Sequence, residues 1–302
     1  MCRADNKFNN LELVMADHAG FCFGVRRAVD AICNALKENI KNKEVWTIGL
    51  PIHNPQEVNR LKAMGLKVAD SVNEIPENAK VLIRAHGEPL SVLNELKLKN
   101  AEVVDTTCPF VSRAQELAAN LSKQGYYIIL LGDKNHPEIQ GILGHVIDSS
   151  AAEVIKNDQE AKGLKILNNK AALISQTTQQ EEMLARVSGV LVSKFRELHV
   201  CNTICKATAE RQEAVRALAE DSLNLNNKLD GMVLIGGKSS ANTGKLRDIA
   251  VNGGLEVLWI EDAVELEENA GWFKNKSKIG IAAGASTPEW LIKEICSKIV
   301  LI

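Results

Sequence analysis

The feature that most constrains the fold of this 302-residue chain is an internal repeat with a period of about 90 residues. Three times, a short strand-like segment leads into a cysteine, and an amphipathic helical pattern follows that cysteine. These segments run from Leu11 to Ala16 before Cys22, from Glu102 to Asp105 before Cys108, and from Glu197 to Val200 before Cys205. The period is too long for a solenoid repeat and favours three small α/β domains related by a pseudo-threefold axis.

The first two helix starts share the pattern Cys-x-x-Val-x-Arg-Ala. It spans Cys22 to Ala28 in the first repeat and Cys108 to Ala114 in the second, whereas Cys205 to Arg211 in the third repeat is a looser match. Pro109 follows its cysteine at a position where the first turn of a helix tolerates proline. We therefore expect each cysteine to stand at a helix N-terminus.

Other polar residues recur at fixed places in the repeat. A second strand in each unit ends in glycine, and four residues after Gly49, Gly132 and Gly236 come His53, His136 and Ser240. A third strand ends in another polar residue, in the runs Ile83-Arg-Ala-His86, Ile174-Ser-Gln-Thr177 and Ala283-Gly-Ala-Ser286. Ligands bind beyond the carboxyl ends of parallel strands, so we expect these groups to face one central cavity.

The predicted fold class is α/β. Three small pseudo-threefold-related domains with parallel sheets would form a trefoil around a central cluster. The predicted domains cover residues 24–107, 108–203 and 204–302, and the N-terminal strand within residues 1–23 would join the third because it leads into the first cysteine.

Composition limits the partners and the location. The chain has 36 Lys and Arg against 38 Asp and Glu, a net charge of −2, so we expect neither nucleic acid nor a membrane as a partner. The longest apolar runs are only strand-length, and the first residues lack the pattern of a signal peptide. We expect a cytoplasmic protein, in which scattered cysteines favour metal binding or catalysis over disulfides.

The three repeat cysteines would make a trigonal thiolate site, because helix N-termini favour thiolates. Three thiolates suit a 4Fe-4S cluster with one non-cysteine-ligated iron, which is left open to bind substrate. Zinc held by these cysteines and a histidine is an alternative, although zinc supplies no electrons. The remaining cysteines are expected to be bystanders, in the core at Cys33 and Cys296 and elsewhere at Cys2 and Cys201.

The polar residues of the repeat are of the kinds that bind phosphate oxygens, and the chain has no P-loop or G-x-G-x-x-G motif for nucleotides. A small diphosphate would be bound by His53, His86, His136, Ser240, Asn242 and Ser286. Glu138 is a candidate proton donor, and Thr177 and Thr178 would place a substrate hydroxyl and relay the proton. Four glycines would permit hinge motion, namely Gly141, Gly144, Gly253 and Gly254.

Taken together, these residues resemble the 4-hydroxy-3-methylbut-2-enyl diphosphate reductases of the non-mevalonate isoprenoid pathway. The similarity extends from about Leu13 to Trp290. It rests jointly on the motifs Gly20-Phe-Cys22-Phe-Gly-Val25-x-Arg27-Ala28, Ile52-His53-Asn54, Arg84-Ala-His86-Gly87, Asp105-Thr-Thr-Cys108-Pro109, His136-Pro-Glu138, Gln176-Thr-Thr178, Asn202-Thr-Ile-Cys205, Gly237-Lys-Ser-Ser240 and Gly284-Ala-Ser286-Thr-Pro288.

The resemblance implies an oxidoreductase that converts its substrate to isopentenyl and dimethylallyl diphosphates by reductive dehydroxylation. Two electrons from a ferredoxin or flavodoxin and two protons would enter. It implies cluster ligands at Cys22, Cys108 and Cys205, proton donation by Glu138, hydroxyl positioning by Thr177, and diphosphate binding by the histidines, Ser240, Asn242 and Ser286. Ala241 departs from the family, which often has a second serine before the asparagine, so one phosphate donor would be missing or replaced by a backbone amide.

Two other function classes fit an open iron. An iron-sulfur hydratase or dehydratase on a small anionic substrate would consume no electrons, whereas a cluster-based redox sensor would be non-catalytic. The sensor would need a surface for a partner or nucleic acid that this charge balance does not indicate.

Overall fold

In the part of the chain that the structure describes, there are three parallel β-sheets of four strands each, so the predicted α/β class is confirmed. The computed structural model describes residues 11–38, 43–166, 168–224 and 226–302. Cys2 lies outside these residues. By compactness the chain divides into two units. One contains residues 1–23, 53–60 and 206–302, and the other contains residues 24–52 and 61–205.

The first sheet has the strand order β3-β2-β4-β5, and all its strand pairs are parallel. One face is covered by Ile32 and Leu61, and the other by Leu96 and Ile75, which are all buried. Its strands are β2 (Val45–Ile48), β3 (Leu66–Ala69), β4 (Lys80–Ile83) and β5 (Glu102–Asp105), and its helices are α1 (Phe23–Lys37), α2 (Pro55–Ala63), the 3₁₀ turn η1 (Val72–Glu74) and α3 (Leu90–Leu98).

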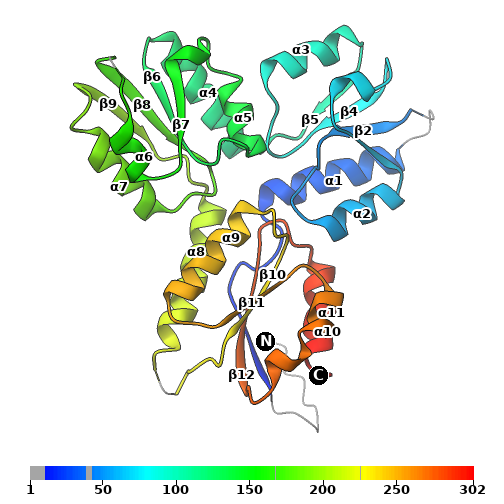
Figure 1. Cartoon of the computed structure of the whole chain (residues 1–302). Coiled ribbons are helices and arrows are strands. Elements are labelled where there is room, and N and C mark those ends of the chain that lie inside the picture. The colour runs from blue at the N-terminus through cyan, green and yellow to red at the C-terminus, as the bar shows by residue number, and fades with distance from the viewer. Residues whose placement is uncertain (1–10, 39–42, 167, 225) are drawn as a thin grey trace. The chain divides into compact units, whose positions relative to one another are not determined.

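The second sheet repeats this order as β7-β6-β8-β9. Its two central strands have buried apolar runs, Ile128 to Leu131 and Ala171 to Ile174, because helices cover both faces, as Figure 1 shows. The strands are β6 (Tyr127–Leu131), β7 (Ala152–Ile155), β8 (Lys170–Ser175) and β9 (Glu197–Cys201). The helices are α4 (Pro109–Lys123), α5 (Pro137–Leu143), η2 (Ser149–Ala151), α6 (Asp158–Gly163) and α7 (Glu181–Leu191).

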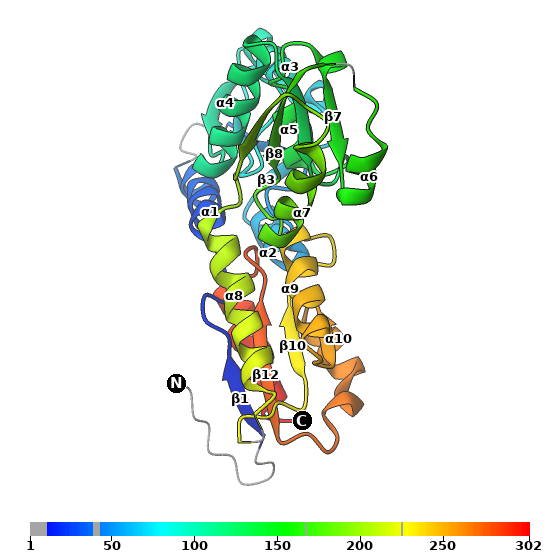
Figure 2. The same cartoon turned by 90° about the vertical axis from the view of Figure 1, so that its left-hand side faces the viewer.

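The third sheet has the order β1-β12-β10-β11, so the first strand of the chain pairs with the last. Helices α8 and α9 pack on one face, and α10 and α11 pack on the other (Figures 1 and 2). The strands are β1 (Glu12–Met15), β10 (Met232–Ile235), β11 (Val257–Ile260) and β12 (Lys278–Ala283). The helices are α8 (Lys206–Asp221), α9 (Ala241–Asn252), α10 (Ala263–Glu268), η3 (Ala270–Phe273) and α11 (Glu289–Ile299).

One detail of the predicted repeat is wrong. Strand β8 ends at Ser175, which pairs with Leu131, just as Ala283 at the end of β12 pairs with Ile235. The third residue past the strand is therefore Thr178 rather than Thr177, and Thr178 corresponds to Ser286. The sequence pattern predicts that this strand ends at Ile174, because the polar Ser175 interrupts the apolar run. Ser175 is nevertheless buried and belongs to the strand.

Candidate active site

Each repeat cysteine stands at the start of a helix. Cys108 is the N-cap of α4, and Cys22 and Cys205 immediately precede α1 and α8. All three are half-buried. The backbone N–H of each cysteine donates to the carbonyl oxygen of the second residue past a neighbouring strand. Cys22 donates to Ala285, Cys108 to Ala85 and Cys205 to Thr177, each at 3.0 Å. The same backbone hydrogen bond therefore recurs at each of the three repeat cysteines.

The Cys108 thiol packs closely against the first turn of α1. A β-carbon placed on Gly24, in the first turn of α1, would lie 2.6 Å from Sγ of Cys108. Only glycine leaves space at this position. The amides at a helix N-terminus also favour the thiolate, which is the form that binds iron or zinc.

The other described cysteines pack against apolar clusters. Cys33 contacts the core of the first sheet, and Cys296 that of the third. Cys201 ends β9 and packs against the cluster beneath α4 and α5. Burial raises the pKa of the Cys201 thiol, with the charge of Arg113 acting in the opposite direction. These contacts agree with a packing role.

Glu138 is the most perturbed acid of the second sheet. It lies in the first turn of α5, with 2% of its surface exposed. Its carboxylate accepts hydrogen bonds from the backbone N–H of Thr177 at 2.6 Å and from the Thr177 hydroxyl at 2.8 Å. Burial raises the pKa of Glu138 to about 7, although both bonds to Thr177 lower it. A carboxyl group with this pKa can hold and release a proton near neutral pH.

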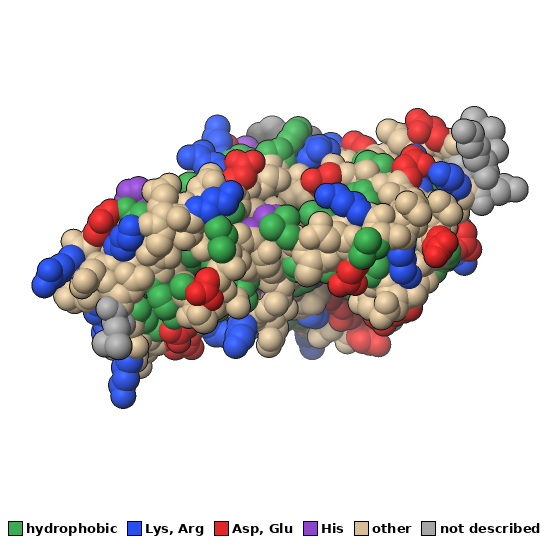
Figure 3. All heavy atoms as spheres, turned by 90° about the horizontal axis from the view of Figure 1, so that it is seen from above, with side chains coloured by type: hydrophobic (Ala, Val, Ile, Leu, Met, Phe, Trp, Pro, Cys, Tyr) green, Lys and Arg blue, Asp and Glu red, His purple; other side chains and the backbone are tan. Residues whose placement is uncertain are grey.

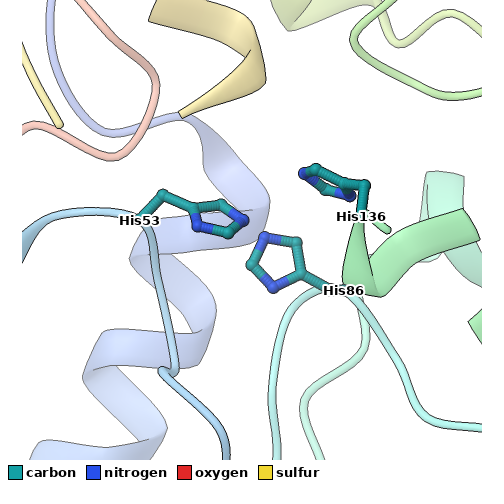
Figure 4. Close-up of side chains that lie close together, drawn as sticks. All are labelled: His53, His86 and His136. Atoms are coloured by element: carbon teal, nitrogen blue, oxygen red, sulfur yellow. The ribbon is translucent and has the colours of Figure 1, made fainter. Parts of the chain in front are cut away.

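Two of the predicted histidines lie beside this acid. His136 is the N-cap of α5, and its Nδ1 accepts the backbone N–H of Glu138 at 3.1 Å. The rings of His86 and His136 meet edge to face, with centroids 5.5 Å apart (Figure 4). Figure 4 also labels His53, which comes from the segment before α2. Thr178 is half-buried, and its hydroxyl oxygen accepts from Nε2 of Gln176 at 3.1 Å.

Gly141 and Gly144, two of the glycines predicted to permit hinge motion, lie at close packing contacts. A β-carbon on Gly144 would lie 2.5 Å from Cβ of Pro89, and one on Gly141 would lie 3.3 Å from the carbonyl oxygen of His86. These two glycines let α5 pack closely on the loop that contains His86. They therefore fix His86 relative to the helix of His136 and Glu138.

The polar residues of the third sheet have fewer internal partners. The Ser240 hydroxyl is the N-cap of α9 and accepts the Thr243 N–H at 3.3 Å. Asn242 is only 4% exposed, and neither its Oδ1 nor its Nδ2 has a hydrogen-bond partner among the residues that the structure describes. Burying an amide without partners costs about 1–3 kcal/mol, so this side chain is suited to a ligand.

Ser286 and His53 are joined within the same compact unit. The Ser286 hydroxyl donates to the His53 carbonyl oxygen at 3.0 Å. A β-carbon on Gly237 would lie 2.4 Å from that oxygen, so glycine is needed there too. The start of α2 is attached to this unit by Trp290, whose Nε1 donates to the buried carboxylate of Glu57 at 2.9 Å. These contacts fix the backbone of His53.

Sequence comparison decides the family. The LytB protein family model matches residues 13–300 of this chain. The chain belongs to the LytB family. The 4-hydroxy-3-methylbut-2-enyl diphosphate reductases of Nautilia profundicola and Aquifex aeolicus are 42% and 39% identical to it, over 93% and 96% of this chain and 95% and 96% of their own lengths.

Solved structures agree with this LytB assignment. The E-1-hydroxy-2-methyl-but-2-enyl-4-diphosphate reductase of Plasmodium falciparum matches with a TM-score of 0.86 at 25% identity, covering 96% of this chain and 88% of that one. A structure of (E)-4-hydroxy-3-methyl-but-2-enyl diphosphate reductase, the terminal enzyme of the non-mevalonate pathway, matches at 39% identity with a TM-score of 0.68, covering 97% and 100%. The predicted family and fold are thus confirmed.

Ala241, where this LytB chain departs from the family pattern, is the first residue of α9. The first N–H groups of a helix have no partner within it. The backbone N–H of Ala241 can therefore donate to an anion that Ser240 also contacts. Lys238 precedes Ser239 and Ser240, but its ammonium group is held by other partners. Its Nζ lies 3.1 Å from Glu265 Oε2 and donates to the Trp259 carbonyl oxygen.

Sequence reasoning gave no role to several residues beside this LytB site. Arg84 and Glu88, two residues either side of His86, form an ion pair at 2.7 Å, and burial raises the pKa of Glu88. Glu57 was likewise missed. The only sequence signal was their position within or next to the quoted motifs, since an ion pair or burial cannot be seen in a local pattern.

Figure 3 shows acidic and basic side chains interspersed on the face it displays. Across the residues that the structure describes, no helix combines the length and apolar character needed to cross a membrane.

Proposed function

We propose that this chain reduces 4-hydroxy-3-methylbut-2-enyl diphosphate to isopentenyl and dimethylallyl diphosphates. The substrate C–O bond breaks and a C–H bond forms. Two electrons and two protons are consumed, and the hydroxyl leaves as water. The observation that supports this chemistry best is Glu138, a buried carboxyl group with a pKa of about 7 in the same compact unit as two helix-initial cysteines.

Iron-sulfur chemistry is a property of the LytB family. We propose Cys22, Cys108 and Cys205 as ligands of a 4Fe-4S cluster with one non-cysteine-ligated iron. Chain connectivity supports this, because Cys22 is two residues from Gly24, where an added β-carbon would lie 2.6 Å from Sγ of Cys108. When bound, such a cluster supplies the electrons and a Lewis-acidic iron.

The diphosphate would be bound by donors from all three sheets. Hydrogen bonds to charged groups contribute about 1.5–3 kcal/mol each, so a few of them suffice for micromolar affinity. The buried amide of Asn242 without internal partners is the strongest support for this assignment. The complete set is His53, His86, His136, Thr178, Ser240, Asn242 and Ser286, with the N–H of Ala241 added.

Glu138 and Thr177 would transfer the proton. The Thr177 hydroxyl lies 2.8 Å from Glu138 Oε2 and donates to it when Glu138 is ionised. When Glu138 is protonated, the carboxyl group donates to the Thr177 oxygen, and the Thr177 hydroxyl is free to donate to the substrate hydroxyl. Protonated Glu138 can then deliver a proton, by way of Thr177, to the leaving hydroxyl. Burial excludes water from this pair, which favours delivery to the substrate rather than loss to solvent.

Two further parts of the proposal concern partners and organisation. The electron donor would be a ferredoxin or flavodoxin, and thiol ligands favour a reducing, cytoplasmic location. The three sheets would belong to domains at 24–107, 108–203 and 204–302, with residues 1–23 in the third.

Anaerobic reconstitution with iron and sulfide followed by turnover assays tests the proposal. We expect iron bound to the protein, and conversion of the hydroxy-diphosphate only when a reduced low-potential donor is present. Turnover without reductant would instead indicate a hydratase or dehydratase, bound iron without turnover a sensor, and bound zinc without iron the zinc alternative. Cys108→Ser should abolish turnover, and full activity of this variant would contradict the ligand assignment.

A further inference from the structure

The shared pattern after the cysteines contains an arginine whose role the reaction does not explain. Arg27 follows Cys22 by five residues, Arg113 follows Cys108 by five, and Arg211 follows Cys205 by six. All three lie within the first two turns of the helices that the cysteines begin. Arg27 and Arg211 each contact the loop before a different cysteine from the one that they follow.

Arg27 reaches the loop that leads into Cys108. Its Nη1 donates to the carbonyl oxygen of Thr107 at 2.8 Å, and its Nη2 donates to that of Asp105 at 3.4 Å. The same loop is turned by the Asp105 carboxylate, which accepts the Thr107 N–H at 2.8 Å. The Arg27 guanidinium thus binds two backbone carbonyl oxygens in the segment just before Cys108, a proposed cluster ligand.

Arg211 makes the matching contact with the loop that leads into Cys22. Its Nη2 donates to the carbonyl oxygen of Gly20 at 2.7 Å, and its Nη1 donates to that of Ala207 in its own helix at 2.8 Å. The side chain is only 5% exposed. Gly20 has φ of +100°, which favours glycine, so the loop has an unusual backbone conformation at the residue that Arg211 contacts.

The helix after the first cysteine therefore contacts the approach to the second. The helix after the third cysteine contacts the approach to the first.

We propose that Arg27 and Arg211 are positioning residues that hold the loops leading into Cys108 and Cys22, two of the proposed cluster ligands. This inference rests on the proposed function for the identity of the cluster, but the contacts themselves do not depend on it. A planar guanidinium can hold two carbonyl oxygens at fixed spacing, which a lysine ammonium cannot do equally well. Its positive charge beside each ligand loop would also stabilise the more negative, reduced state of the cluster.

The test compares Arg27→Gln with Arg26→Gln. Arg26 is the exposed arginine one residue earlier in α1, so the control removes the same charge from the same turn. In the apoprotein, hydrogen exchange of the peptide covering residues 105–108 should accelerate about tenfold in Arg27→Gln, the effect of losing about 1.4 kcal/mol of local stability. It should stay at the wild-type rate in Arg26→Gln.

In the reconstituted protein, Arg27→Gln should retain at most about half of the wild-type iron per chain after gel filtration, and its cluster should have a more negative reduction potential by spectroelectrochemistry. Arg27→Lys, which keeps the charge but loses the planar pair of donors, should restore the potential more fully than the exchange protection. A purely structural role would not move the potential. Arg211→Gln should show the same changes, with faster exchange at residues 20–22.

Arg27→Gln matching Arg26→Gln in both exchange and potential would overturn the proposal. Arg211 is buried, so a change in Arg211→Gln can also reflect misfolding. The comparison of Arg27→Gln with Arg26→Gln therefore decides the test, because both of these arginines are exposed. If the wild-type protein binds no iron on reconstitution, the proposed function fails, while the exchange measurement on the apoprotein still decides whether the arginine holds its loop.

Discussion

The second and third sheets place different chemistry at the same point of a shared backbone pattern. After β6 and β8, the second sheet presents His136, Glu138 and Thr177, which are joined to one another by hydrogen bonds. After β10, the third sheet presents Ser240 and Asn242, and the side chain of Asn242 has no internal partner among the described residues. The comparison indicates that the second sheet is built to hold a proton and the third to bind an external anion.

The largest effect expected from this comparison is at Glu138. Glu138→Gln should lower kcat about 10²–10⁴-fold with little change in KM, because the variant keeps the shape but has no proton to donate. Wild-type kcat should fall as the pH rises through about 7, where Glu138 loses its proton, and the variant should lack this limb. Steady-state kinetics from pH 5.5 to about 9 measure both, with exposed Glu116→Gln as the control.

The same residue affects stability in a defined direction. The pKa of Glu138 is raised from 4.5 to about 7 on folding, so the folded state binds this proton more tightly than the unfolded state. Its contribution is fully present below pH 4.5 and is lost as the pH rises through 7. Urea unfolding should show this decline in the wild type and less of it in Glu138→Gln. Parallel pH profiles would contradict the raised pKa.

The next largest effect tests the anion-binding role of the third sheet. Asn242→Ala should raise KM about 10–100-fold, the effect of losing about 1.5–3 kcal/mol of hydrogen bonding to a charged group, and should leave kcat nearly unchanged. Its unfolding free energy should not fall much, because no internal partner among the described residues is lost. Asn252→Ala, at the exposed end of the same helix, is the matched control. A fall in kcat with unchanged KM would assign Asn242 to the chemistry instead.

A smaller effect is expected at Thr177, which supports the acid. Thr177→Val removes the hydroxyl bond that lowers the pKa of Glu138, while the backbone N–H bond is kept. The alkaline limb of kcat should therefore move to higher pH, and kcat should fall about tenfold because one hydrogen bond of about 1 kcal/mol or more is lost. Thr177→Ser, which retains the hydroxyl, should keep the wild-type profile. An unmoved limb in Thr177→Val would separate Thr177 from proton transfer.

The smallest effect concerns Ala241. Ala241→Ser adds a hydroxyl at the first position of α9, where the backbone N–H has no acceptor within the helix. We expect KM to fall by about twofold to tenfold, since a further neutral donor contributes about 0.5–1.5 kcal/mol. A much larger fall would show that the amide does not replace the missing serine.

The sequence alone predicted the local features of this protein. Short apolar runs separated by helical patterns predicted parallel strands, and the placement of each cysteine at a helix start followed from the repeat. These predictions succeeded because hydrophobic periodicity and helix-start preferences depend on neighbouring residues. The placement of Thr178 failed for a related reason, since the polar but buried Ser175 belongs to β8 and local polarity suggested an earlier end.

The tertiary structure decided what depends on segments far apart in the chain. Burial raises the pKa of Glu138, and two hydrogen bonds from Thr177, which is 39 residues away, lower it. Close packing places Gly141 and Gly144 against the segment of His86 and Pro89. In the sequence, Arg27 and Arg211 are visible only as arginines that recur after the cysteines. Arg27 bonds to Thr107, 80 residues away, and Arg211 bonds to Gly20, 191 residues away. These bonds exist only once the strands have paired. Burial and long-range hydrogen bonding are properties of the folded arrangement, whereas periodicity is already present in the unfolded chain.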